Sequence, residues 1–122
     1  MNQEILDKFG RLLIKEVFDC HYSFVKNDLA DLKVTERFKN LFSNMNENQK
    51  AELERMQFEL LSGMIFDFLK IFEENREFKI IYEENNNQID LNRISEMLKA
   101  EPIINGGWID RFSRYKSDRI PF

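Results

Sequence analysis

Apolar residues recur every three or four positions along the first part of the chain, which predicts an amphipathic helix from Asn2 to about Lys26. The main apolar row of this helix is Leu6, Phe9, Leu13, Val17, Cys20 and Phe24. Beside it, in the C-terminal half, lies a second row of Ile14, Phe18, Tyr22 and Val25. That half is apolar over a wider arc than a surface helix needs, so we expect other elements or a partner to enclose it.

The segment from 47 to 74 predicts a second long helix. It contains no proline, and the side chain of Asn46 or Asn48 is suited to accept hydrogen bonds from the first unpaired amides. Its apolar residues come in neighbouring pairs, which are Leu60 and Leu61, Met64 and Ile65, Phe68 and Leu69, and Ile71 and Phe72. Such pairs cover most of the helix circumference, which predicts a central helix where Gly63 allows a neighbour to approach closely.

Beyond Asn75 the apolar period changes from that of a helix to the two-residue alternation of a strand. The apolar residues that follow this alternation are Phe78, Ile80, Tyr82, Ile89 and Leu91. Between them, Asn85 to Asn87 give a strong turn signal, because asparagine tolerates a left-handed backbone. The pattern predicts a β-hairpin.

A shorter helix, with Thr35 as a possible N-cap and its end near Asn44, is predicted between the two long ones. Short helical segments are also predicted at 94–100 and 109–115. We therefore expect a single α+β domain over residues 1–122, mainly helical, with two long packed helices, a shorter helix and a C-terminal β-hairpin.

Composition excludes several function classes. The chain has 122 residues, 43% of them apolar, which is enough to form a core in one domain. Its net charge of -4 has the wrong sign for a general nucleic-acid binder. The longest strongly apolar stretch contains Asp67 and Lys70 and is shorter than the roughly 20 residues that cross a bilayer. We expect neither nucleic acid nor a membrane as a partner.

Cys20 is the only cysteine and His21 the only histidine. A lone cysteine forms no internal disulfide, and the first residues lack the pattern of a secretory signal, so we expect a cytoplasmic protein. Adjacent helical residues point about 100° apart, which does not suit a thiolate and imidazole pair. The sequence predicts no catalytic residue, no metal site and no cofactor.

Asp67 falls within the apolar stripe of the second long helix. A carboxylate enclosed there needs a cation or amide donors, and His21 is a natural candidate. Two interpretations are open. The first is a polar pair that only makes packing specific. The second is a small-molecule-binding or weakly catalytic helical pocket around Asp67, His21 and Tyr22, in which Asp67→Asn would abolish ligand binding while the fold persists.

Residues 73 to 101 hold eight carboxylates and four basic side chains, so the acidic excess of the chain is concentrated around the hairpin. This excess predicts either a solvated face or a landing surface for a basic protein. The binding candidates on this surface are Glu83, Glu84 and Asp90.

The C-terminal segment combines three aromatic residues with several basic ones. Aromatic side chains either fix such a tail onto the core or act as interaction hot spots. In the second case Trp108 is the candidate anchor for a partner.

The order FDFLKIFEEN, EFKIIYEENNNQIDLNRISEML and EPIINGGWIDRFSRYK resembles a group of small uncharacterised bacterial proteins with a helical N-terminal half and a Gly-Trp-Ile motif in the tail. The similarity covers about the last 60 residues, and GGWIDRFSRYK is its most specific part. In size, acidity and general form these proteins look like the immunity proteins that neutralise bacterial toxins, and no catalytic residues come with the resemblance.

We therefore expect a non-enzymatic protein-binding module, an immunity protein that neutralises a basic toxin through an acidic surface. The pocket around Asp67 and His21 is the first alternative. A homodimer of structural role, formed through the excess apolar surface of the first helix, is the second.

Overall fold

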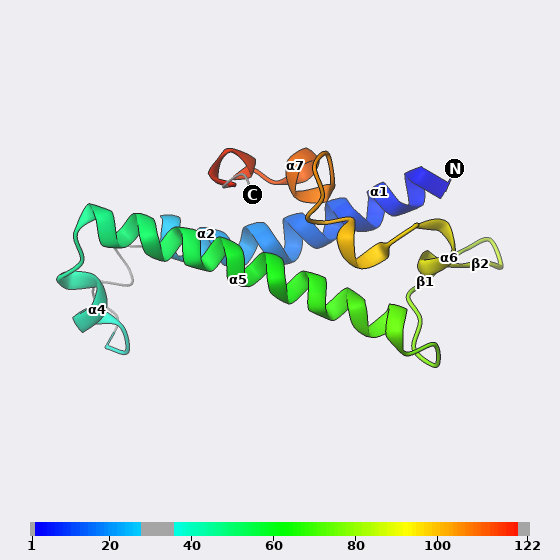
Figure 1. The fold of residues 1–122 in the computed structure, drawn as a ribbon, viewed down its shortest axis with the longest axis horizontal. Coiled ribbons are helices and arrows are strands. Elements are labelled where there is room, and N and C mark those ends of the chain that lie inside the picture. The colour runs from blue at the N-terminus through cyan, green and yellow to red at the C-terminus, as the bar shows by residue number, and fades with distance from the viewer. Residues whose placement is uncertain (1, 28–35, 120–122) are drawn as a thin grey trace.

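The computed structural model describes residues 2–27 and 36–119. The first long helix consists of three consecutive segments, α1 (Asn2–Leu13), the π-helical turn η1 (Ile14–Asp19) and α2 (Cys20–Asn27). After it come α4 (Lys39–Ser43) and the second long helix, α5 (Glu47–Glu74). Figure 1 shows α5 alongside the first long helix, with α4 at one end of the molecule and the hairpin at the other.

The C-terminal part contains a two-stranded antiparallel sheet followed by short helices. Its elements are β1 (Ile81–Glu84), β2 (Asn87–Asp90), α6 (Leu91–Ile94), η2 (Leu98–Ala100), α7 (Trp108–Phe112) and η3 (Lys116–Asp118). The predicted α+β class with mainly helical content is confirmed. The proposed cap Thr35 lies outside the described residues.

The π-helical turn decides which face of the first long helix is buried. Five buried residues of the first long helix recur at every fourth position, namely Leu6, Gly10, Ile14, Phe18 and Tyr22. In an α-helix of 3.6 residues per turn, such a row drifts by about 40° per step. The wider turn of η1 reduces this drift and keeps the row against the core.

The main apolar row expected for this helix is therefore wrong in its C-terminal half. The side chains of Val17 and Phe24 are 39% and 45% exposed, and Cys20 is exposed as well. Phe18 and Tyr22, which belong to the second predicted row, are buried instead.

Helix α5 begins as predicted but is not enclosed. Asn46 caps it, because its side chain accepts a hydrogen bond from the backbone amide of Gln49, while the side-chain oxygen of Gln49 accepts one from the backbone amide of Asn46. One face packs into the core through Phe58, Ile65 and Leu69. The prediction that another element approaches closely at Gly63 is wrong, since a Cβ atom at this position would meet nothing within 4 Å.

The opposite face of α5 carries large apolar side chains that remain between 47% and 64% exposed. They are Met56, Leu60, Met64, Phe68 and Ile71, called the α5 apolar row below. At 100° per residue these five positions fall within one arc of about 120°.

The hairpin turn consists of Asn85 and Asn86, whose φ angles are 52° and 67°. Glu84 pairs with Asn87, so the loop has two residues and Asn87 already belongs to β2. Asparagine tolerates these left-handed angles, which match the twist of the two strands. The predicted turn is correct to within one residue.

Trp108 is fully buried, which corrects the expectation that it anchors a partner. Its ring meets Phe9 edge to face at 5.7 Å between centroids. A Cβ atom on Gly10 would lie only 2.5 Å from the indole, so the glycine leaves the space that Trp108 fills. The Gly-Trp-Ile segment therefore fixes the C-terminal part onto α1.

Asp19 provides the second attachment of this part. The carboxylate is buried and accepts hydrogen bonds from the Ser113 hydroxyl at 2.6 Å and the Arg114 amide at 2.9 Å. Both donors follow α7, so one side chain of η1 holds the chain after the helix ends.

We expect Asp19→Ala to lower the free energy of unfolding by about 2 kcal/mol, because it leaves a buried hydroxyl and a partly buried amide without their acceptor. The measurement is urea unfolding followed by circular dichroism. The control is Asp67→Ala, an exposed carboxylate whose loss should change stability by less than about 0.5 kcal/mol. Equal losses in the two variants would contradict the role assigned to Asp19.

Candidate functional site

The predicted pocket around Asp67, His21 and Tyr22 is not formed. The side chains of Asp67 and His21 are exposed, and that of Tyr22 is buried. The contact given for His21 is made by its backbone carbonyl, which accepts a hydrogen bond from the side chain of Gln57 at 2.8 Å. Asp67 does lie among apolar residues, as predicted, yet the stripe around it faces solvent.

Tyr22 belongs to a different polar cluster. Its hydroxyl donates to Asp118 at 2.8 Å, and Lys26 donates to the same carboxylate oxygen at 2.6 Å. Burial and the hydrogen bond to Asp118 raise the pKa of Tyr22. Glu54 lies 3.8 Å from the Lys26 ammonium, so the cluster joins α2, α5 and η3. This arrangement fastens three elements together.

The acidic candidates of the hairpin do not share one surface. Successive strand residues point to opposite faces, and paired residues share a face. Glu83, paired with Gln88, therefore lies on the opposite face from Glu84. The face of Glu84 also carries Tyr82, which packs against the core.

Glu83 and Glu84 are both exposed, and each accepts a hydrogen bond from a neighbouring side chain of the hairpin. The side chain of Gln88 donates to Glu83 at 3.2 Å, and the hydroxyl of Tyr82 donates to Glu84. Asp90 is different, because it is half-buried and accepts a hydrogen bond from the amide of Asn92 at 3.0 Å, which caps α6. Of the three acidic residues predicted to meet a partner, Glu83 and Glu84 are therefore the exposed ones.

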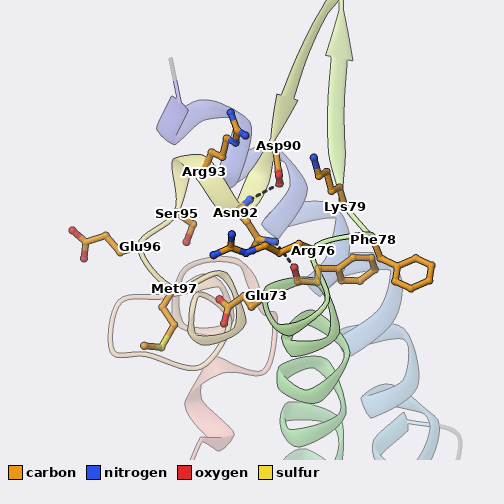
Figure 2. Close-up of a pocket in the computed structure, with 11 residues that line it drawn as sticks. Glu73, Arg76, Phe78, Lys79, Asp90, Asn92, Arg93, Ser95, Glu96 and Met97 are labelled. Atoms are coloured by element: carbon orange, nitrogen blue, oxygen red, sulfur yellow. Dashed lines mark hydrogen bonds between the residues drawn. The ribbon is translucent and has the colours of Figure 1, made fainter.

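A hollow of about 470 Å³ lies where the end of α5 meets the hairpin and α6. Figure 2 shows its lining, which includes three basic residues (Arg76, Lys79 and Arg93) and three acidic ones (Glu73, Asp90 and Glu96). No feature of the sequence indicated it, because its basic residues are spread over 18 positions of an acidic segment.

A second hollow, of about 480 Å³, lies between α5 and the C-terminal segment. Phe58, Phe66, Ile103 and Ile109 give it a mainly apolar lining. Neither hollow contains His21 or Asp67, so the small-molecule alternative loses the residues first assigned to it.

Family models, curated proteins and solved structures give no match to this chain. Within residues 2–27 and 36–119, no helix is long and apolar enough to cross a membrane. The same residues contain no group of three or more His, Cys, Asp or Glu side chains placed to hold a metal ion.

The cluster around Asp118 predicts a pH dependence of stability. Burial alone would raise the pKa of Asp118, but the hydrogen bonds from Lys26 and Tyr22 outweigh it and the pKa is lowered. A carboxylate whose pKa is lower in the folded state stabilises the fold above its unfolded value and loses that effect in acid.

We expect Asp118→Asn to cost about 1 kcal/mol at pH 7, because the hydrogen bonds to a charged acceptor are weakened. The difference from the unmodified protein should shrink as the pH falls below 3.8, the ordinary value for aspartate. Urea unfolding at several pH values measures it. A difference that stays constant down to strongly acidic pH would show that ionised Asp118 is not the stabilising species.

Proposed function

We propose that this protein works by binding another protein rather than by catalysis, and that the α5 apolar row is the docking surface. The observation that carries the proposal is the exposure of five large apolar side chains, each about half open to solvent, on one face of a single helix. Soluble proteins seldom leave such a patch uncovered unless it binds something. Helix α5 has 28 residues, so the row is long enough to contact a partner helix or sheet.

The chemistry of the partner is indicated by Asp67. This carboxylate lies within the row and has no ion-pair partner among the described residues. A protein that covers the row would bury the charge, and an unpaired buried carboxylate is costly. The partner that fits best therefore presents apolar side chains together with a lysine or arginine opposite Asp67.

This requirement favours a foreign partner over a second copy of the chain. The row contains no cation, so two copies packed through it would bury two carboxylates without a partner from the facing row. The net charge of -4 and the exposed Glu83 favour encounter with a basic protein. A basic toxin, neutralised by this chain as an immunity protein, satisfies these conditions and agrees with the resemblance of the C-terminal sequence.

A photo-crosslinking amino acid in place of Met64 tests the docking surface in the source cells. The matched control carries the same group in place of Glu59, which is exposed on another face of α5. We expect position 64 to capture a basic protein, identified by mass spectrometry, and position 59 to capture little of it. Capture of the same proteins at both positions, or of this chain alone, would contradict the proposal.

With the captured protein purified, Asp67→Lys should weaken binding at least tenfold, or about 1.4 kcal/mol, because it replaces attraction by repulsion at the centre of the row. Glu59→Lys makes the same change in charge outside the row and should alter the dissociation constant by less than about twofold. Isothermal titration calorimetry measures both. Equal weakening by the two variants would show that the net charge of the protein, and not the position of Asp67, affects binding.

Reversing the charge of the hairpin glutamates tests electrostatic steering. We expect Glu83→Lys to slow association with the basic partner several-fold at low salt, with the difference disappearing at high salt. Glu84 lies on the other face of the hairpin, so Glu84→Lys should slow association less than Glu83→Lys does. Stopped-flow association rates at two salt concentrations give the answer, and unchanged rates for both variants would remove the hairpin from the proposal.

A further inference from the structure

The loop between η2 and α7 contains Asn105, the only asparagine of the chain that a glycine follows. Asn105 and Gly106 are the central residues of a β-turn, which is closed by a hydrogen bond of 2.9 Å from the Gly107 amide to the Ile104 carbonyl. Gly106 has a left-handed φ of 73°, as the third residue of a type II turn requires. Both central residues are exposed, and a Cβ atom on Gly106 would meet nothing within 4 Å. The turn is therefore open to water.

An asparagine that precedes glycine can lose its side-chain nitrogen without an enzyme. The amide nitrogen of the next residue loses its proton and attacks the carboxamide carbon, Cγ, and the new N–Cγ bond closes a succinimide ring while the carboxamide nitrogen takes up a proton and leaves as ammonia. Water then opens the ring at either carbonyl, which gives aspartate or isoaspartate. Glycine favours the attack, because no Cβ atom crowds its nitrogen and its backbone rotates freely. The exposed turn at Asn105 meets these requirements.

A carboxylate holds the nitrogen that makes this attack. The Gly106 amide donates a hydrogen bond to Oδ2 of Asp110 at 2.8 Å, and Oδ1 of the same carboxylate accepts one from Arg119 at 2.7 Å. Burial alone would raise the pKa of Asp110, but these hydrogen bonds outweigh it and the pKa is lowered, so the group is charged at neutral pH. A negative charge beside the amide opposes the loss of its proton. Asp110 therefore slows a reaction that the open turn favours.

The backbone after the turn has no space for a longer chain. In isoaspartate the main chain runs through the former side chain, which adds one methylene group to it. Gly107 is buried, and a Cβ atom on it would lie only 2.3 Å from the carbonyl oxygen of Glu101. The Trp108 amide donates to the same oxygen at 2.9 Å. The added methylene would therefore displace the segment that holds Trp108 against α1.

We propose that Asn105 is a site of spontaneous deamidation, that Asp110 restrains its rate through the Gly106 amide, and that the isoaspartate product weakens the attachment of the C-terminal part. The reaction consumes one water molecule and releases one ammonia molecule, and no cofactor takes part. Its product accumulates with the age of the protein. The inference does not depend on the binding role of α5, because the site lies in a different loop and needs no partner.

Peptide mapping by mass spectrometry tests the site on the purified protein, incubated at neutral and at mildly alkaline pH. The internal controls are Asn85, Asn86 and Asn87, which are exposed but are followed by residues with side chains. We expect Asn105 to deamidate at least about tenfold faster than these, which corresponds to a barrier lower by about 1.4 kcal/mol. The rate should rise with pH, because the attacking amide must lose its proton. Deamidation no faster at Asn105 than in the hairpin would overturn the proposal.

Asp110→Asn tests the restraint, and it should accelerate deamidation of Asn105 several-fold because it removes the charge beside the Gly106 amide. The matched control is Asp7→Asn, which makes the same change in charge and breaks the ion pair with Arg111 at 2.9 Å, but leaves the bond to the Gly106 amide in place. It should change the rate by less than about twofold. Thermal unfolding verifies that both variants fold. Equal acceleration in the two variants, or none in Asp110→Asn, would contradict the role of Asp110.

Urea unfolding before and after incubation tests the structural consequence. The parent protein is compared with Asn105→Gln, whose longer side chain closes the corresponding ring far more slowly. We expect the aged parent protein to contain a fraction that unfolds at lower urea concentration, in proportion to its isoaspartate content, while aged Asn105→Gln unfolds as it did before incubation. An aged parent protein that contains isoaspartate and unfolds unchanged would show that the turn accepts the longer backbone, and would contradict this part of the proposal.

Discussion

The packing of Trp108 against Gly10 is the contact on which the rest of the structure depends. The indole fills the space left by the missing side chain of the glycine, and it brings α7 onto the first long helix. Asp19 then holds the residues that follow α7. Because the C-terminal part is fixed to the first helix in this way, its short elements cover part of the core without needing long strands or helices of their own.

The same arrangement leaves one side of α5 open. The buried face of the helix packs into the core through Phe58, Ile65 and Leu69. No described element covers the α5 apolar row, so its side chains stay about half exposed. An apolar surface of this kind is stable in water only at a cost in free energy, and a protein partner would remove that cost. In the proposed docking, Asp67 would make the surface selective, since a partner that covers the row would have to bring a cation to pair with the carboxylate.

The arrangement of charged residues in the folded chain differs from their order along the sequence. The acidic segment around the hairpin contains four cations, and the turn back through α6 brings three of them to one hollow. Glu83 and Glu84 are adjacent in sequence but face opposite sides of the hairpin. The molecule therefore offers two separate surfaces of different chemistry, an apolar row with a single carboxylate and a hollow lined by both basic and acidic side chains.

The sequence by itself determined the local elements. Periodicity located the two long helices, and residue type limited the cap of α5 to Asn46 or Asn48 and placed the asparagine turn of the hairpin, because each feature depends on residues close together in the chain. Tertiary structure decided which faces are buried. The π-helical turn moved the core row to Phe18 and Tyr22, and the position of the C-terminal part enclosed Trp108 while leaving Asp67 exposed. Apolar pattern alone does not distinguish a core face from a docking face, since both consist of the same residue types.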